Sequence, residues 1–141
     1  MPIKDYSTKI APEKTIAEIQ ARLVKNGARK MGFRYDDAGN LESITFNMDV
    51  ENLFVSFCIA PNFEGVLAAL KRTGAPKNLL TTEQAVRVAW RIEKDWLEAQ
   101  LAKIESGLAT PFQLLLPYAV TDNGQTFYQK VIQSGTKFIN Q

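Results

Sequence analysis

The chain has 141 residues, of which 45% are hydrophobic and 23% are charged, and its formal net charge is +2. These values are ordinary for a globular protein, and the length predicts a single domain spanning residues 1–141. The sequence contains no histidine and a single cysteine, Cys58. This composition excludes histidine-based catalysis, histidine-ligated metals and an internal disulfide. Carboxylate-based metal chemistry stays open, but no segment carries the packed acids that it requires. We therefore expect no catalytic residues, no metal site and no cofactor.

No apolar run approaches the ~18 residues that a membrane span needs. The opening segment, Met1-Pro-Ile-Lys-Asp5, lacks the apolar stretch of a signal peptide. We expect a cytoplasmic protein that does not interact with membranes.

The first elements in chain order are an arm, a helix and three strands. Residues 1–11 show no periodicity and predict an extended arm. Thr15-Ile-Ala-Glu18 has the pattern of a capping box and predicts a helix over residues 15–26, which Gly27 ends. The hydrophobic period then changes from 3.6 to 2, and the predicted strands cover residues 30–35, 43–48 and 53–59. Turns at residues 36–40 and 49–52 would join these strands into an antiparallel meander with one buried face.

The second half of the chain is predicted to be helical. A short helix follows Pro61-Asn62 and stops near Gly74. The long amphipathic segment Thr81–Gly107 has a second capping box and contains both tryptophans, Trp90 and Trp96, which we expect to be buried.

Two further short helices complete the predicted order. One lies between Thr110 and Pro117, and the last spans residues 126–134. The apolar residues expected to be buried in this last helix are Phe127, Val131 and Ile132. The fold class is α+β: a three-stranded antiparallel meander, preceded by one helix and packed against a long C-terminal helix with shorter helices.

The polar face of the predicted sheet is the first candidate site. Alternation places on this face Lys30, Arg34, Ser43, Thr45, Asn47, Phe54 and Ser56. The cations Lys30 and Arg34 could hold phosphates, with polar groups from Thr45 and Asn47, while a base stacks on Phe54. An antiparallel sheet also commonly leaves a polar face to water, and a dimer contact would explain Phe54 equally well.

The long helix carries a second candidate. Arg87, Arg91 and Lys94 line one stripe, and Arg87 and Arg91 are the ligand-binding candidates there. The same spacing allows ordinary i,i+4 ion pairs. The acids available for these pairs are Glu83, Asp95 and Glu98.

The cations are unevenly distributed along the chain. Five basic residues and no acid lie between Arg22 and Tyr35, and Arg34 has no acid near it in this run. Lys71, Arg72 and Lys77 lie in a second acid-free stretch, between Glu64 and Glu83. Such runs form two local positive patches, which are usually solvated surface and could also meet a phosphate-bearing partner.

Several segments together resemble a family of small uncharacterised proteins carried by bacteriophages and mobile elements. The segments that carry the resemblance are Tyr6–Ile10, Lys14–Gln20, Ala85–Gly107, Leu116–Tyr118 and Gly124–Tyr128. The resemblance implies a viral protein of the host cytoplasm, accessory to DNA metabolism or host takeover. The α-β-β-β-α start also looks like the strand-annealing proteins of phage recombination, which is an analogy at the level of the fold.

The sequence is consistent with two functions. The leading hypothesis is a non-enzymatic phage accessory protein that binds a phosphate-bearing ligand, with single-stranded nucleic acid foremost. The alternative is a counter-defence protein that inhibits a host protein or sequesters a small nucleotide messenger in a closed pocket. We also expect a homodimer or higher homo-oligomer, because the long helix is broadly apolar, Phe54 is exposed and the sheet has open edges.

Overall fold

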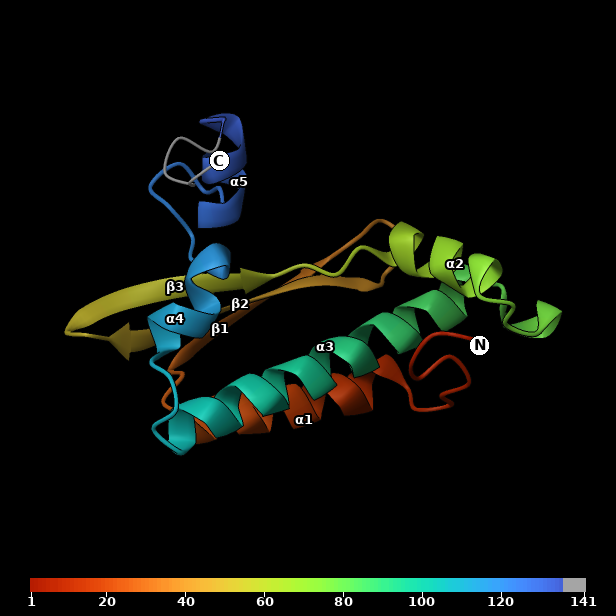
Figure 1. The fold of residues 1–141 in the computed structure, drawn as a ribbon, viewed down its shortest axis with the longest axis horizontal. Helices are drawn as coiled ribbons and strands as arrows, with labels where there is room; N and C mark the ends of the chain where they lie inside the picture. The colour runs from red at the N-terminus through yellow and green to blue at the C-terminus, as the bar shows by residue number, and fades with distance from the viewer. Residues whose placement is uncertain (136–141) are drawn as a thin grey trace. The chain divides into compact units, whose positions relative to one another are not determined.

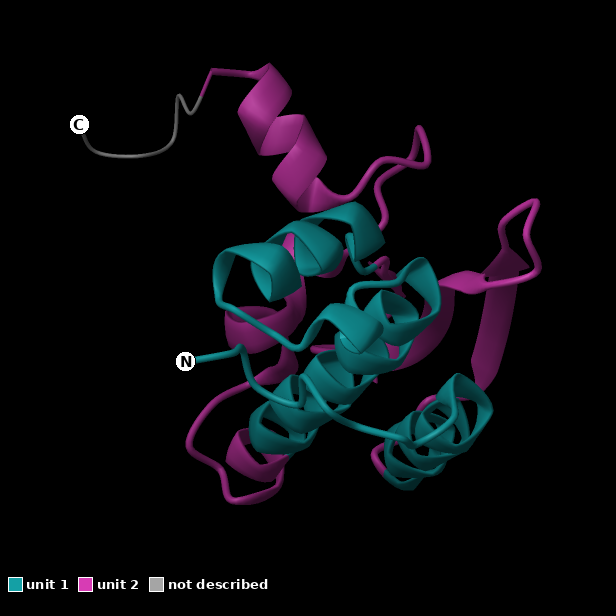
Figure 2. Cartoon of the chain, turned by 90° about the vertical axis from the view of Figure 1, so that its right-hand side faces the viewer, with its two compact units in different colours: residues 1–25, 61–101 teal, residues 26–60, 102–141 magenta. Residues whose placement is uncertain are grey.

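The computed structural model describes residues 1–135, and residues 136–141, the end of the expected domain, lie outside the described part. The chain divides into two compact units, shown in Figure 2. Unit 1 contains residues 1–25 and 61–101, and unit 2 contains residues 26–60 and the chain from residue 102 onward. The predicted α+β class and order of elements are confirmed: one helix, three strands, then a long helix with shorter helices (Figure 1).

The first helix, α1, spans Pro12–Lys25 in unit 1, so the predicted start at Thr15 is wrong. Pro12 occupies the first helical position, where the missing N–H would have no partner anyway. The carbonyl of Ala11 accepts hydrogen bonds from the backbone amides of Lys14 (3.1 Å) and Thr15 (3.3 Å). Thr15 is therefore buried within the helix and does not cap it.

The other helices of unit 1 are α2 (Phe63–Arg72), η1 (Lys77–Leu79) and the part of α3 (Thr82–Glu105) that runs to Leu101. The side chain of Asn62 caps α2 by accepting a hydrogen bond from the Gly65 amide at 2.9 Å. Buried Leu70, Ala75 and Ala85 form a core cluster. The side chains packed against this cluster are Ile3, Tyr6, Val66, Leu67 and Leu80.

The N-terminal arm is fixed to the rest of unit 1 by polar contacts as well as by this apolar cluster. The amide of Ile3 donates to Oγ1 of Thr73 at 3.2 Å. The side-chain amide of Gln84 donates to the carbonyls of Tyr6 (2.9 Å) and Thr8 (3.0 Å). Gln84 therefore attaches the arm to α3. Of the predicted Thr81–Gln84 capping box, only the Thr81 half forms: its hydroxyl accepts a hydrogen bond from the Gln84 amide at 3.1 Å.

The three strands of unit 2 are β1 (Lys30–Tyr35), β2 (Leu41–Val50) and β3 (Leu53–Ile59), and they form an antiparallel sheet with β2 in the centre. Strand β2 is longer than predicted at both ends. The turn after it contains only Glu51 and Asn52, which have positive φ values of 50° and 68°. Two left-handed residues are typical of the tight hairpin turn that matches strand twist. The predicted four-residue turn at 49–52 is therefore wrong by two residues.

The register of the sheet separates an apolar face from a polar face. Phe46 pairs with Met31 on one side and Phe57 on the other, and the rings of Phe46 and Phe57 stack with centroids 5.5 Å apart. The fully or nearly buried side chains of the apolar face are Ile44, Phe46, Met48, Val50, Phe57 and Ile59. The predicted alternation is confirmed for most of β2, although Ser43 is buried. It is wrong for Phe33 and Tyr35 of β1 and for Leu53 of β3, which were predicted on the buried face and are 39%, 62% and 58% exposed.

The outer edge of β3 is occupied by a later segment of unit 2. Phe57 forms an isolated bridge with Ala119, and the amide of Val120 donates to the carbonyl of Ser56 at 2.7 Å. This segment follows α4 (Pro111–Leu115) and η2 (Leu116–Tyr118). The expectation of two open edges is thus wrong for the β3 edge, since residues 119–120 cover part of it.

The last helix, α5, spans Phe127–Gln133. The prediction that its apolar residues are buried is wrong for Phe127 and Ile132, which are 36% and 54% exposed. Val131 is half-buried. Nine of the eleven exposed large hydrophobic side chains within residues 1–135 belong to unit 2. Self-association stays a prediction. No helix in the described part of the chain combines the length and apolarity that crossing a membrane requires.

The two tryptophans of α3 differ in burial, and this difference generates a prediction. Trp90 is fully buried, whereas Trp96 is partly exposed, so the expectation of burial is confirmed for Trp90 only. Trp90→Ala should lower the free energy of unfolding by about 3–5 kcal/mol, because it opens a large cavity. Trp96→Ala should cost clearly less. Urea denaturation of both variants checks this, and an equal or larger loss in the Trp96 variant would contradict it.

Candidate nucleic-acid interface

The register brings the predicted sheet residues Lys30, Arg34, Thr45, Asn47 and Phe54 onto one face of unit 2. They form successive rows across the strands. The rows, in order along β2, are Arg34–Ser43, Gly32–Thr45–Cys58, Lys30–Asn47–Ser56 and Asp49–Phe54. Neighbouring rows are two residues, or about 7 Å, apart, so the four rows span about 20 Å.

Two neighbouring rows of this face expose a cation and an aromatic ring. The side chain of Phe54 is 56% exposed, and Lys30 is exposed and makes no ion pair within residues 1–135. Asn47 and Ser56, in the same row as Lys30, and Thr45, in the next row, are half-buried. An ammonium group, an amide and hydroxyls beside an accessible ring can hold a phosphodiester chain while a base stacks.

Arg34 differs from its prediction, because it already has an acidic partner. Its Nε lies 2.9 Å from Oε1 of Glu42 on the neighbouring strand. The register shifts between Arg34 and Tyr35, so Glu42 of the neighbouring strand lies beside Arg34, although no acid lies between Arg22 and Tyr35 in the sequence. The side chain of Arg34 is 80% exposed, and exposed ion pairs of this kind contribute little and are screened by salt. Arg34 can therefore still bind a phosphate by giving up Glu42, but it is a weaker phosphate-binding candidate than Lys30, which is unpaired within the described residues.

Gly32 lies in the middle of β1 and was missed by the sequence argument. Glycine weakens a strand interior, so its presence there needs a reason. A Cβ added at Gly32 would meet only Cβ of Thr45, at 3.9 Å, and its φ is not in the left-handed region. Neither internal packing nor backbone geometry therefore requires a glycine here. Close approach of a ligand to the backbone would explain it.

Arg87 and Arg91, the candidates on α3, lie in unit 1, and acids already engage both. Nη2 of Arg87 pairs with Oε1 of Glu83 at 2.6 Å. Nη1 of Arg91 pairs with Oε2 of Glu18 on α1 at 3.1 Å, so the expected Arg91–Asp95 pair is wrong. These contacts explain the α3 stripe as helix–helix and intrahelical pairing, and they leave it a poor phosphate site.

Glu18 connects α1 to two cations of α3. Its Oε2 also lies 3.4 Å from Nζ of Lys94, which in addition pairs with Glu98 at 3.2 Å. Arg91 further approaches the buried hydroxyl of Thr15 at 3.4 Å. Burial opposes ionisation of Glu18, but the hydrogen bonds and charges of Lys94 and Arg91 outweigh it and lower the pKa of Glu18. Thr15 and Glu18 were expected to cap α1, but their side chains instead contact the cations of α3.

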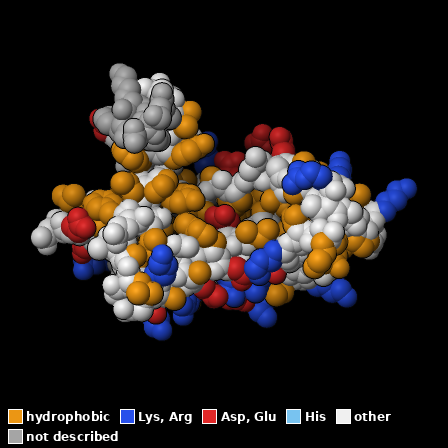
Figure 3. Space-filling view, viewed as in Figure 1, with side chains coloured by type: hydrophobic (Ala, Val, Ile, Leu, Met, Phe, Trp, Pro, Cys, Tyr) orange, Lys and Arg blue, Asp and Glu red, His pale blue; other side chains and the backbone are white. Residues whose placement is uncertain are grey.

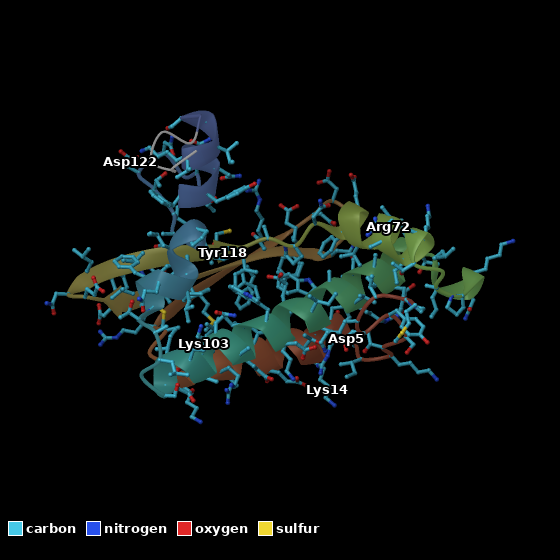
Figure 4. All side chains as sticks on the ribbon, viewed as in Figure 1. Asp5, Lys14, Arg72, Lys103, Tyr118 and Asp122 are labelled. Carbon is cyan, nitrogen blue, oxygen red and sulfur yellow. The ribbon has the colours of Figure 1, made fainter. Side chains whose placement is uncertain are left out.

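A second polar cluster lies where the N-terminal arm meets α3, near the labelled Asp5 in Figure 4. Nζ of Lys4 is 2.7 Å from Oδ2 of Asp95 and 3.6 Å from Oδ2 of Asp5. Oδ2 of Asp5 is buried and accepts no hydrogen bond within the described residues. Burial and the neighbouring Asp95 raise the pKa of Asp5 more than Lys4 lowers it. Burial also opposes ionisation of Asp95, but Lys4 and Asp5 lower its pKa overall.

The two aspartates do not amount to a metal site, since no group of three or more His, Cys, Asp or Glu side chains within residues 1–135 could hold an ion. The predicted absence of a catalytic site and of a cofactor stays a prediction. Comparisons found no family model, curated protein or solved structure that matches the chain. The expected relationship with bacteriophage proteins therefore also stays a prediction.

The aspartate pair generates a prediction about pH. A raised pKa means that ionising Asp5 opposes folding, so its favourable contribution is complete below the ordinary value of ~3.9 and is lost as the pH rises through the raised value. Asp5→Asn should therefore raise the melting temperature at pH 7, with an advantage that disappears in acid. Asparagine also tolerates the φ of 63° at this position.

Asp95→Asn is the matched control for this prediction. The pKa of Asp95 is lowered, so its ionised form stabilises the fold above the ordinary pKa, and its removal should lower the melting temperature at pH 7. Thermal melts of both variants between acid and neutral pH measure the difference. A lower melting temperature for Asp5→Asn at pH 7 would contradict the account of this pair.

Proposed function

We propose that the protein binds single-stranded nucleic acid without acting on it chemically, through the polar face of the sheet in unit 2. The observation that carries this proposal is Gly32. It lies on the face between Lys30 and Arg34, in a position where neither packing nor backbone geometry requires a glycine. A ligand chain that approaches the backbone there would be flanked by the ammonium of Lys30 and by the guanidinium of Arg34.

The exposed ring of Phe54 favours an unpaired strand over a duplex. Bases can stack on an aromatic side chain only when they are not stacked within a helix, and such stacking tolerates any sequence. The row that contains Lys30, Asn47 and Ser56 lies between the glycine and the ring. Its amide and hydroxyl groups would contact phosphates and sugars, which position a strand without reading its bases.

The cellular context of the proposal comes from the resemblance alone. It would make the protein a cytoplasmic accessory factor of a bacteriophage, acting in DNA metabolism. The alternative, a counter-defence protein that inhibits a host protein or sequesters a small nucleotide messenger, would use the same cations in an enclosed pocket. Salt dependence distinguishes a strand from a small nucleotide, because each phosphate that a strand brings releases counterions.

Gly32→Val tests the proposal by filling the space over the sheet. Valine suits a strand better than glycine, so the variant should be as stable as the wild type or more so. Its affinity for a fluorescein-labelled oligothymidylate should nevertheless fall by about 1–3 kcal/mol, which corresponds to the loss of one stacked base. Fluorescence anisotropy measures the affinity, and thermal melting measures the stability.

Phe33→Val is the matched control, because it changes the neighbouring residue of β1 on the opposite face. It should leave oligothymidylate affinity unchanged. If Gly32→Val folds and binds as tightly as the wild type, the ligand does not cover this face and the proposal fails.

A further inference from the structure

Three cations occur close in sequence, at the end of α2 and the start of η1. Lys71 and Arg72 are in the last turn of α2, and Lys77 is the first residue of η1. We refer to these three residues as the basic turn. All three are exposed, and no acid occurs between Glu64 and Glu83. Figure 3 shows several Lys and Arg side chains over α2 and the segment after it, and Figure 4 labels Arg72.

Within residues 1–135, the cations of the basic turn are not used in ion pairs, unlike the cations of α3. Within the described residues, none of the three forms an ion pair, whereas Arg87, Arg91 and Lys94 each pair with a glutamate. Cations in a last helical turn also offset the negative end of the helix dipole, which would explain Lys71 and Arg72. Lys77 lies beyond the end of that helix, so the dipole does not explain the complete set.

The backbone that carries the basic turn is held in place. The amide of Ala75 donates to the carbonyl of Leu70 at 3.0 Å, while Gly74 has a φ of 78°, so a left-handed glycine ends α2. Leu70 and Ala75 are buried in the core cluster of unit 1. The hydroxyl of Thr73 donates to the carbonyl of Ala69 at 2.7 Å. A ligand would therefore find the cations on an ordered turn, at a lower entropic cost than on a mobile loop.

The surroundings of the basic turn favour a phosphate chain over a protein partner. Within the described chain, no large hydrophobic side chain between residues 61 and 101 is exposed. Protein interfaces usually depend on several buried aromatic or aliphatic anchors. Residues 61–101 offer none, and the arm that hydrogen-bonds to Thr73 through Ile3 exposes a single large hydrophobic side chain, Met1. Nucleic-acid backbones need no such anchor, because counterion release supplies the affinity.

We propose that the basic turn is a further, sequence-independent contact of this protein with the phosphate backbone of single-stranded nucleic acid. The inference rests on the proposed function, since the ligand is the same nucleic acid. The sheet face supplies the ring on which a base stacks, and the basic turn supplies free cations. The two contacts leave different signatures, because stacking contributes affinity and the cations contribute salt dependence.

The test compares two triple variants that remove the same charge. Lys71→Gln/Arg72→Gln/Lys77→Gln neutralises the basic turn. Lys9→Gln/Lys14→Gln/Lys25→Gln neutralises three other exposed lysines of unit 1. Each protein is titrated into a fluorescein-labelled oligothymidylate of about 16 nucleotides, at salt concentrations from about 50 to 200 mM. Thermal melts establish that both variants are folded.

The basic-turn variant should lose three phosphate contacts. At about 0.7 per contact, the slope of log affinity against log salt should become about 2 smaller, and affinity near 0.1 M salt should fall about 100-fold. The control variant should keep the wild-type slope. Equal behaviour of the two triple variants would overturn the inference, even if Gly32→Val binds weakly as the proposed function requires.

The remaining outcomes separate the two proposals. If Gly32→Val binds like the wild type while the basic-turn variant loses affinity and slope, the sheet face fails and the basic turn stands. If the wild type does not bind oligothymidylate, both fail. Binding of a polyglutamate peptide by the wild type and not by the basic-turn variant, without oligothymidylate binding, would overturn the assignment in favour of an acidic protein partner.

Discussion

The pairing of β2 with both of its neighbours is the interaction on which the candidate interface depends. A slip of one residue in either pairing would move each side chain of the displaced strand to the opposite face. Two features oppose such a slip. The two-residue turn of Glu51 and Asn52 fixes the register of β3 against β2. Burial of Ile44 and Phe46 keeps the apolar side of the central strand facing the core. The rows that carry Lys30 and Phe54 follow directly from this register.

The two units distribute chemistry differently over their surfaces. Unit 1 uses most of the charge on α3 internally: Glu18 holds Arg91 and Lys94, and Lys4 of the arm holds Asp95. Its remaining exposed cations include the basic turn, which belongs to a stretch, residues 61–101, that exposes no large apolar side chain. Unit 2 exposes most of the large apolar side chains, Phe54 among them. A ligand with both charged phosphates and flat bases is the class of molecule that suits both surfaces.

Periodicity predicted the sheet well, because period-2 alternation reports directly which side chains share a face. Periodicity could not predict which acid pairs with which cation. Arg34 meets Glu42 through a shift in register, and Arg91 meets Glu18 through the packing of α1 beside α3, neither of which leaves a local pattern. The prediction of a capping box at Thr15–Glu18 was wrong for the same reason, since a capping box and a tertiary ion-pair site use the same residue types. Gly32 was detectable in principle, because a glycine inside an alternating strand is a known signal of close backbone approach.

The most direct test of the account is a map of where a strand binds. Backbone amide chemical shifts of the full chain, followed by NMR during titration with an oligothymidylate of about 16 nucleotides, report each position separately. The account predicts the largest changes at Gly32, Asn47 and Phe54, with smaller ones at Phe33 and Met48 on the opposite face. Changes confined to that opposite face, or an absence of changes in all three strands, would contradict it.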